Sequence, residues 1–204
     1  MGETLNVPVT QQFGEALHYA SELHARQARK GTQIPYISHL MSVSALVMEA
    51  GGSETAAIGA LLHDAAEDQG GEDTLRTIRE KFGAEVEEIV RHCSDDIVAE
   101  GEQKRPWRER KEQYIARLNA TDASADALLV SLGDKLHNCT AIVNDVMLLG
   151  DSVWGRFNAS PTEIAWYYRE IARIAEEKLP NSPLTGLLRE GVGRLHELAQ
   201  RSER

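Results

Sequence analysis

The sequence predicts an all-α protein built as a single domain, and three observations carry this prediction. Apolar residues recur at the three- and four-residue spacing of amphipathic helices through nearly the whole chain, and glycines and prolines separate these runs. No alternating run of β-branched residues is long enough to indicate a sheet. A chain of 204 residues is also long enough to bury one substantial core.

The first expected helices follow one another closely. Residues 11–30 form the first, because their apolar residues share one helical face. Residues 38–50 form the second, which ends at a pair of glycines. Ser53 can cap a third helix over residues 53–65, whose apolar residues face inward. These boundaries matter because the residues of chemical interest lie near them.

The rest of the chain continues the helical pattern. Further helices are expected over residues 73–82, 83–93, 106–119, 122–149, 161–179 and 183–201. The stretch 94–107 is the most loop-like part of the interior. No internal repeat and no linker divides the chain, so we expect one domain over residues 1–204.

The bulk composition narrows the function. The net charge of −10 disfavours nucleic-acid binding, and a phosphorylated ligand would need a metal ion and a few clustered cations. No segment has the length of a membrane span and no signal peptide is evident, so we expect a cytoplasmic protein without a membrane partner. Cys93 and Cys139 are expected to be reduced thiols. The oligomeric state is open.

Four residues carry side chains that bind metals. His63 and Asp64 are adjacent near the end of the predicted helix 53–65, so a nitrogen and an oxygen can reach one cation. His39 begins the preceding helix. Asp134 lies among leucines in a long helix, where a carboxylate is costly unless a positive charge meets it. We therefore expect His39, His63, Asp64 and Asp134 to bind one metal ion.

This ligand set predicts hydrolysis of a phosphate compound. Two imidazoles and two carboxylates suit Mn²⁺, Fe²⁺ or Zn²⁺, which can lower the pKa of water and polarise phosphorus. Glu67 and Asp68 follow Asp64 by three and four residues, so they are expected to lie on the same helical face and to handle the attacking water. His137 and Asn138 stand in the same relation to Asp134, so they too can face the metal and could hold a sugar hydroxyl or a phosphate.

The order of these motifs resembles that of the HD phosphohydrolase superfamily. The closest resemblance is to the hydrolase domain of the RelA/SpoT homologues and to the small alarmone hydrolases. It is carried by HARQARKGTQIPYISHLMSVSALVMEAGG, AAIGALLHDAAEDQ, FGAEVEEIVRHCSDD, ERKEQYIARL and SLGDKLHN. The resemblance covers residues 15–145 and leaves a helical C-terminal extension over residues 150–204.

The resemblance implies both a fold and an activity. The fold is an HD-domain helical bundle. The activity is removal of the 3′-pyrophosphate from a purine alarmone, (p)ppGpp or (p)pApp, with Mn²⁺ as the usual ion and Fe²⁺, Zn²⁺ or Mg²⁺ as alternatives. Matched to this sequence, the family pattern gives the same four ligands, with Glu67 and Asp68 as the acids that handle water. It also puts Arg29 and Lys30 on the first helix as substrate-binding residues, with the arginine packed on the purine and the neighbouring cation helping to bind phosphate. Asn138 matches the substrate-binding asparagine near the ribose and phosphates.

Departures from the family pattern leave the base preference open. Ala28 stands where the family often has the first of two arginines, and Thr140 stands where it usually has an arginine. Two other functions also stay open. One is an HD phosphohydrolase of another nucleotide, such as a 5′-nucleotidase or a triphosphohydrolase. The other is a module that senses a nucleotide without cleaving it.

Two further segments have weaker interpretations. Trp166, Tyr167 and Tyr168 could line a base pocket, but such a cluster is more often part of a core. The charged run that contains Lys104 and Arg108 is interpreted as a solvated segment, with a phosphate-binding lid as the alternative.

Overall fold

The computed structural model describes residues 9–95, 97, 105–120 and 124–203. This described part is helical and contains no strand, and its one β-type contact is an isolated antiparallel bridge between Ala28 and Pro35. The all-α prediction is therefore confirmed. Among the described helices, none has the length and apolar character needed to cross a membrane.

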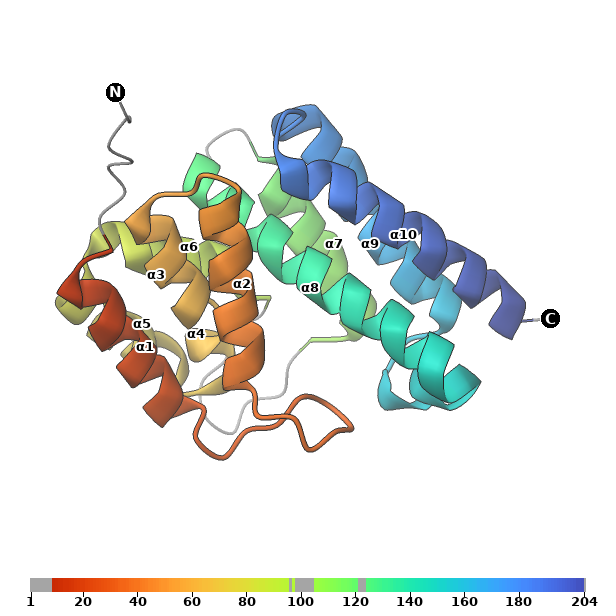
Figure 1. The fold of residues 1–204 in the computed structure, drawn as a ribbon, viewed down its shortest axis with the longest axis horizontal. Helices are drawn as coiled ribbons and strands as arrows, with labels where there is room; N and C mark the ends of the chain where they lie inside the picture. Colours follow the sequence, from red (N-terminus) through yellow and green to blue (C-terminus); the bar gives the residue numbers. More distant parts are fainter. Residues whose placement is uncertain (1–8, 96, 98–104, 121–123, 204) are drawn as a thin grey trace, which may run out of the picture.

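The helices follow the order expected from the sequence (Figure 1). Their bounds are α1 (Gln11–Leu23), α2 (Ile37–Glu49), α3 (Glu54–Leu62), α4 (Ala65–Asp68), α5 (Gly71–Phe82), α6 (Ala84–Cys93), α7 (Trp107–Asn119), α8 (Ala125–Leu149), α9 (Pro161–Lys178) and α10 (Pro183–Ser202). A short 3₁₀ helix, η1 (Gly150–Arg156), follows α8 and was not expected.

Side-chain caps explain where several helices begin. The hydroxyls of Thr10, Ser53, Ser124 and Ser160 each accept a hydrogen bond from a backbone N–H in the first turn of α1, α3, α8 and α9. Ser160 and Glu163 form a reciprocal capping box. These contacts satisfy N–H groups that the helix itself leaves without partners.

The predicted first helix over residues 11–30 is too long. It ends at Leu23, after which the chain turns at His24, Ala25 and Arg26. Gly31 adopts a positive φ of 72°, which a helix does not accommodate. Arg29 and Lys30 therefore lie on a loop rather than on the first helix.

The predicted helix over residues 53–65 is interrupted. α3 ends at Leu62, and His63 and Asp64 form a turn before α4. His63 Nδ1 contacts the carbonyl oxygen of Ala60 at 2.8 Å, the acceptor that Asp64 would use in a continuous helix. The side chain thus competes with the helical hydrogen bond at the point where the metal-binding residues diverge.

The long helix α8 lies between two halves of the molecule. Figure 1 shows α1 to α6 on one side of α8, with α7, α9 and α10 on the other. The first core includes Leu40, Ile58, Leu62, Leu75, Ile78 and Val90. The second includes Val130, Cys139, Ile171, Leu188 and Leu195. Since α8 packs against α2 and α3 as well as α9 and α10, it brings the residues of both halves to one point.

Candidate metal centre

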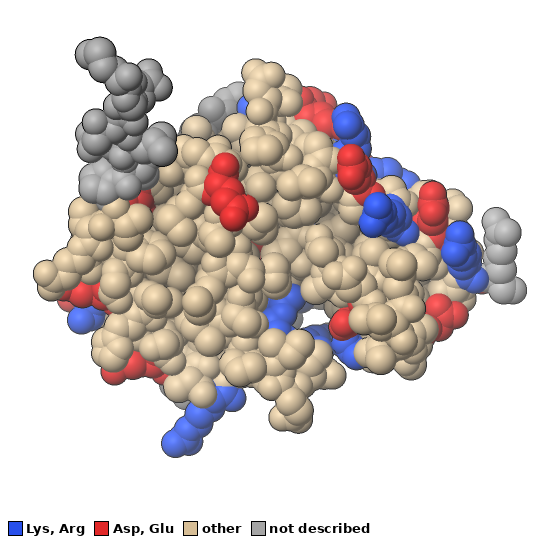
Figure 2. All heavy atoms as spheres, in the orientation of Figure 1, with Lys and Arg blue, Asp and Glu red and all other residues tan. Residues whose placement is uncertain are grey.

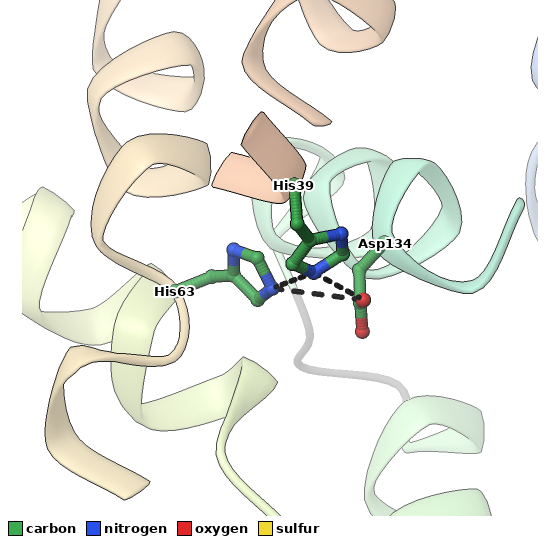
Figure 3. A group of neighbouring side chains, drawn as sticks. All are labelled: His39, His63 and Asp134. Carbon is green, nitrogen blue, oxygen red and sulfur yellow. Dashed lines mark hydrogen bonds and ion pairs between the residues drawn. The ribbon is translucent and has the colours of Figure 1, made fainter. Parts of the chain in front are cut away.

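Three buried side chains from separate segments converge on one point. His39 comes from α2, His63 from the turn after α3, and Asp134 from the middle of α8 (Figure 3). The two Nε2 atoms are 3.3 Å apart. Asp134 Oδ1 lies 3.2 Å from His39 Nε2 and 3.6 Å from His63 Nε2. Since each residue offers one ligand atom to a common point, this group is consistent with a metal site.

Asp64 lies at the edge of this group. Its Oδ2 is 3.0 Å from His63 Nε2 and 3.6 Å from His39 Nε2. The hydroxyl of Tyr36 donates a 2.6 Å hydrogen bond to the same oxygen. The structure thus brings together all four residues that the sequence analysis selected, and it adds Tyr36 as a partner of the most exposed of them.

The donor atoms suit a cation. The contact from His63 Nδ1 to the Ala60 carbonyl puts the ring hydrogen on Nδ1, because a carbonyl oxygen can only accept. In the neutral ring, Nε2 of His63 then carries the lone pair that ligation requires. Burial would lower the pKa of His63, but the nearby carboxylates of Asp64 and Asp134 raise it well above its usual value. The centre thus favours a positive charge between these side chains.

Asp134 already has one positive neighbour. Lys135 Nζ lies 2.5 Å from Asp134 Oδ2, and both side chains are buried. Burial would raise the pKa of Asp134, but the Lys135 ammonium, together with hydrogen bonds from the histidines, holds it well below its usual value. Burial would lower the pKa of Lys135, and Asp134 raises it instead. The cost of burying Asp134 is therefore met in part by Lys135, a partner that the sequence argument did not consider.

Glu67 and Asp68 lie on α4, directly after the turn that carries Asp64. Glu67 Oε2 accepts a 2.9 Å hydrogen bond from the backbone N–H of Asp95. Asp68 Oδ2 accepts a 2.7 Å hydrogen bond from Gln27 Nε2. Each acid is thus oriented by a segment outside its own helix. Their role towards water stays a prediction.

A cavity of about 530 Å³ opens beside the metal group. The described residues that line it include Arg29, Lys30, Tyr36, Trp107, Lys111, Lys135, His137, Asn138, Asp145, Arg156, Phe157, Tyr167 and Tyr168. Figure 2 shows Lys and Arg side chains in the hollow between α2 and the C-terminal half of α8. Because basic side chains outnumber acidic ones in this lining, the cavity fits an anionic ligand.

The three predicted substrate-binding residues all line this cavity. Arg29 Nη2 donates a 2.7 Å hydrogen bond to Asn138 Oδ1. Asn138 Nδ2 in turn donates to Asp134 Oδ1, so a chain of contacts runs from Arg29 to the metal group. Lys30 Nζ lies 6.0 Å from the centre of the Phe157 ring. Hydrogen bonds thus link Arg29 and Asn138 to the metal group, whereas Lys30 lies over the ring of Phe157.

The sequence analysis considered His137 as a side chain that can face the metal and hold a sugar hydroxyl or a phosphate. Its Nδ1 lies 2.8 Å from Nδ1 of His39. Burial, followed by the charges of His39 and Arg29, lowers the pKa of His137 to about 4. The neutral ring is therefore the stable form near neutral pH.

Several other lining residues escaped the sequence analysis. Tyr36 lies three residues before His39, and Lys135 follows Asp134, so proximity in sequence could have indicated both. Arg156 and Lys111 could not be found in this way, because they reach the cavity from η1 and α7. Only the folded chain brings these cations to the same cavity.

Part of the aromatic cluster on α9 belongs to the buried core and also lines the cavity. Tyr167 and Tyr168 are buried, yet both line the cavity. Trp166 lies outside the described lining and instead packs against Arg108, whose guanidinium carbon is 3.4 Å from the ring centre. Lys104 lies outside the described residues, so the lid hypothesis for this residue stays untested.

Comparisons with known proteins agree with this geometry. The profile of the HD domain family matches residues 16–161. The guanosine-3′,5′-bis(diphosphate) 3′-pyrophosphohydrolase of Xenopus tropicalis is 37% identical over 127 residues, which are 61% of this chain and 65% of that enzyme. The corresponding enzyme of Mus musculus is 36% identical over 62% of this chain and 67% of its own length. The match thus spans about two thirds of these relatives.

A solved structure extends the similarity to the fold. A metazoan orthologue of SpoT that hydrolyses ppGpp superimposes with a TM-score of 0.70 at 25% identity. The superposition covers 92% of this chain and 97% of the other. The likeness therefore includes helices on both sides of α8.

Proposed function

This chain belongs to the HD domain family, and on that premise we propose that it removes the 3′-pyrophosphate from a purine alarmone, (p)ppGpp or (p)pApp, in a metal-dependent hydrolysis. The observation that carries the proposal is the convergence of His39, His63 and Asp134 beside a cavity rich in basic side chains. Similarity to 3′-pyrophosphohydrolases supports the choice of substrate class.

Asp64 is the fourth proposed ligand, and Mn²⁺ is the proposed ion, with Fe²⁺, Zn²⁺ and Mg²⁺ as alternatives. The distances from Asp64 Oδ2 to both Nε2 atoms support its inclusion. Two nitrogen and two oxygen donors form a mixed set that suits these ions better than a purely soft or purely hard one. When bound, such an ion lowers the pKa of water and polarises a phosphoryl group.

The bond changes define what the protein side chains must do. The oxygen of water forms a bond to the phosphorus attached to the ribose 3′ oxygen, and the bond between that phosphorus and the 3′ oxygen breaks. Glu67 and Asp68 are the groups proposed to accept the proton of water and to return one to the 3′ oxygen as pyrophosphate leaves. Gln27 and the N–H of Asp95 hold the two carboxylates in fixed directions.

The cavity supplies the binding energy. Arg29 and Asn138 are proposed to contact the nucleotide near the metal group, since they are already linked to each other and to Asp134. Lys30 is proposed to bind phosphate at the loop side of the cavity. Because the whole chain carries a net charge of −10, attraction of a polyanion must depend on these local cations.

The proposed location is the cytoplasm. Both cysteines, Cys93 and Cys139, are unpaired and buried. Thiols of this kind are typical of a reducing compartment, where nucleotides are also turned over.

The test is to incubate the purified protein with Mn²⁺ and either ppGpp or pppApp, and to identify the products chromatographically. The expected products are pyrophosphate together with GDP from ppGpp or ATP from pppApp. Asp64→Ala is expected to abolish the release, whereas His18→Ala, at an exposed histidine of α1, keeps it. Pyrophosphate release that persists in Asp64→Ala would refute the assigned centre. Orthophosphate as the product would instead indicate a nucleotidase.

A further inference from the structure

The two histidines of the metal group are held differently at their second ring nitrogen. His63 Nδ1 contacts the backbone carbonyl of Ala60 at 2.8 Å, and this oxygen can only accept a hydrogen bond. His39 Nδ1 instead contacts Nδ1 of His137 at 2.8 Å, and an imidazole nitrogen can either donate or accept. The main chain therefore fixes the tautomer of His63, while the tautomer of His39 depends on another side chain.

The contact between His39 and His137 requires one shared hydrogen. Two ring nitrogens at this distance form a hydrogen bond only when one carries the hydrogen and the other presents a lone pair. His39 can bind a cation through Nε2 only when that atom carries no hydrogen, which puts the hydrogen of the neutral ring on Nδ1. His137 Nδ1 must then accept, and neutral His137 carries its own hydrogen on Nε2.

We propose that His137 is a positioning residue that accepts the Nδ1 hydrogen of His39 and thereby holds His39 in the tautomer that binds the metal ion. The inference rests on the metal centre of the proposed function. Outer partners of this kind fix the direction of a ligating ring and increase its basicity. His137 thus does for His39 what the Ala60 carbonyl does for His63.

The burial of His39 and its contact with His137 support this role for His137. The side chain of His39 is completely buried, so bulk water does not contact it. The His137 ring centre lies 4.8 Å from that of His39. His137 also lines both the cavity beside the metal group and a second cavity of about 520 Å³ among α2, α8 and α10. Removal of its ring would leave a buried N–H without its acceptor, which is costly.

The first test compares two substitutions at one position. His137→Leu removes the acceptor, whereas His137→Asn restores one, because the asparagine Oδ1 stands as far along the side chain as the histidine Nδ1. Mn²⁺ affinity is measured by competition with a fluorescent chelator, and thermal unfolding confirms that each variant is folded. We expect His137→Leu to weaken Mn²⁺ binding by about 10- to 100-fold and His137→Asn to recover most of the loss.

The matched control is His18→Leu, which removes an exposed histidine and is expected to leave Mn²⁺ affinity unchanged. Wild-type affinity in folded His137→Leu would overturn the inference. Equal losses in the leucine and asparagine variants would do the same, because they would show that the acceptor is not what matters.

A second readout reports the tautomers directly. In ¹⁵N-labelled protein loaded with diamagnetic Zn²⁺, the ring-nitrogen shifts should show hydrogen on Nδ1 of His39 and on Nε2 of His137. The reverse arrangement contradicts the inference. Both measurements omit the nucleotide, so a protein that binds metal but cleaves no alarmone would contradict the proposed substrate alone. Wild-type protein that binds no divalent ion would overturn both proposals.

Discussion

The two ends of the cavity are built in different ways. At the metal end, His39, His63 and Asp134 are almost fully buried, and each has a defined partner. At the other end, Lys30 lies on the loop after α1 and Arg156 ends the 3₁₀ helix after α8. Side chains held by a packed core keep one geometry, whereas those on loops adjust more readily. The difference suggests that the core determines the reaction and the loops determine the ligand.

The links between the two ends support the same division. Asn138 contacts both Asp134 and Arg29, so it lies between the metal group and the substrate side. Beyond this point the contacts are less buried, as in the pair of Arg156 with Asp145, whose side chains are partly exposed. Substitutions at the metal end should therefore abolish the reaction, and those at the far end should change binding.

The largest effect is expected from Asp134→Ala. Loss of Oδ1 removes one proposed ligand, so metal content and hydrolysis should both disappear. Loss of Oδ2 leaves the buried Lys135 ammonium without its partner, which should lower the free energy of unfolding by about 3–5 kcal/mol. Elemental analysis measures the metal, and urea unfolding measures the stability.

The double variant Asp134→Ala/Lys135→Met separates these two effects. Replacing the charged side chain with an apolar one of similar length should restore much of the stability without restoring the metal. A double variant as unstable as Asp134→Ala would contradict the role given to Lys135. Retained metal in Asp134→Ala would contradict the proposed ligand set and remove the contrast between the two ends.

The metal end was predictable because its signals are local. A histidine-aspartate pair after an apolar helix, and a carboxylate among leucines, are both visible within a few residues of sequence. Helical periodicity then indicates which side chains face inward. The contribution of Lys135 was missed because the argument assumed that a buried carboxylate needs a metal, although the adjacent lysine meets the same need.

The far end was less predictable because it depends on distant contacts. Arg29 and Asn138 are 109 residues apart in sequence and meet only after folding. The helix expected over residues 11–30 also misplaced Arg29 and Lys30, since the turn at Gly31 and the bridge from Ala28 to Pro35 override the local helical pattern. Spacing in sequence gives no information on the contact between Arg29 and Asn138, whereas Gly31 and Pro35 are turn residues that could have indicated the loop.

A smaller effect is expected from Glu67→Gln and Asp68→Asn, which lie next to the metal end. These acids are proposed to move protons and not to bind the ion. Each substitution should therefore lower kcat by about 100- to 10,000-fold while the metal content stays at the wild-type level. Steady-state kinetics and elemental analysis on the same samples provide the two measurements.

Glu85→Gln is the matched control, since this exposed glutamate lies on α6 away from the cavity lining. It should leave both quantities unchanged. Loss of metal in Asp68→Asn would show that this residue helps to hold the ion. Asp68 would then be assigned to metal binding rather than to proton transfer alone. An unchanged kcat in both variants would contradict their proposed role.

The smallest effect is expected at the far end, from Arg156→Gln. Arg156 lines the cavity and packs closely over Gly31, where an added Cβ would lie 2.7 Å from Arg156 Cδ. It is partly exposed, so its contribution to phosphate binding should be about 1–2 kcal/mol. Because this binding is the same in the ground state and the transition state, KM should rise roughly 5- to 30-fold with kcat unchanged.

Salt dependence makes this last test sharper. Added salt screens exposed charges, so the KM of the wild type should rise more steeply with ionic strength than the KM of Arg156→Gln. Arg173→Gln, at an exposed arginine of α9, should behave like the wild type. A fall in kcat at constant KM would show that Arg156 acts on the reaction itself. Chemistry and recognition would then share one site rather than occupy two ends of the cavity.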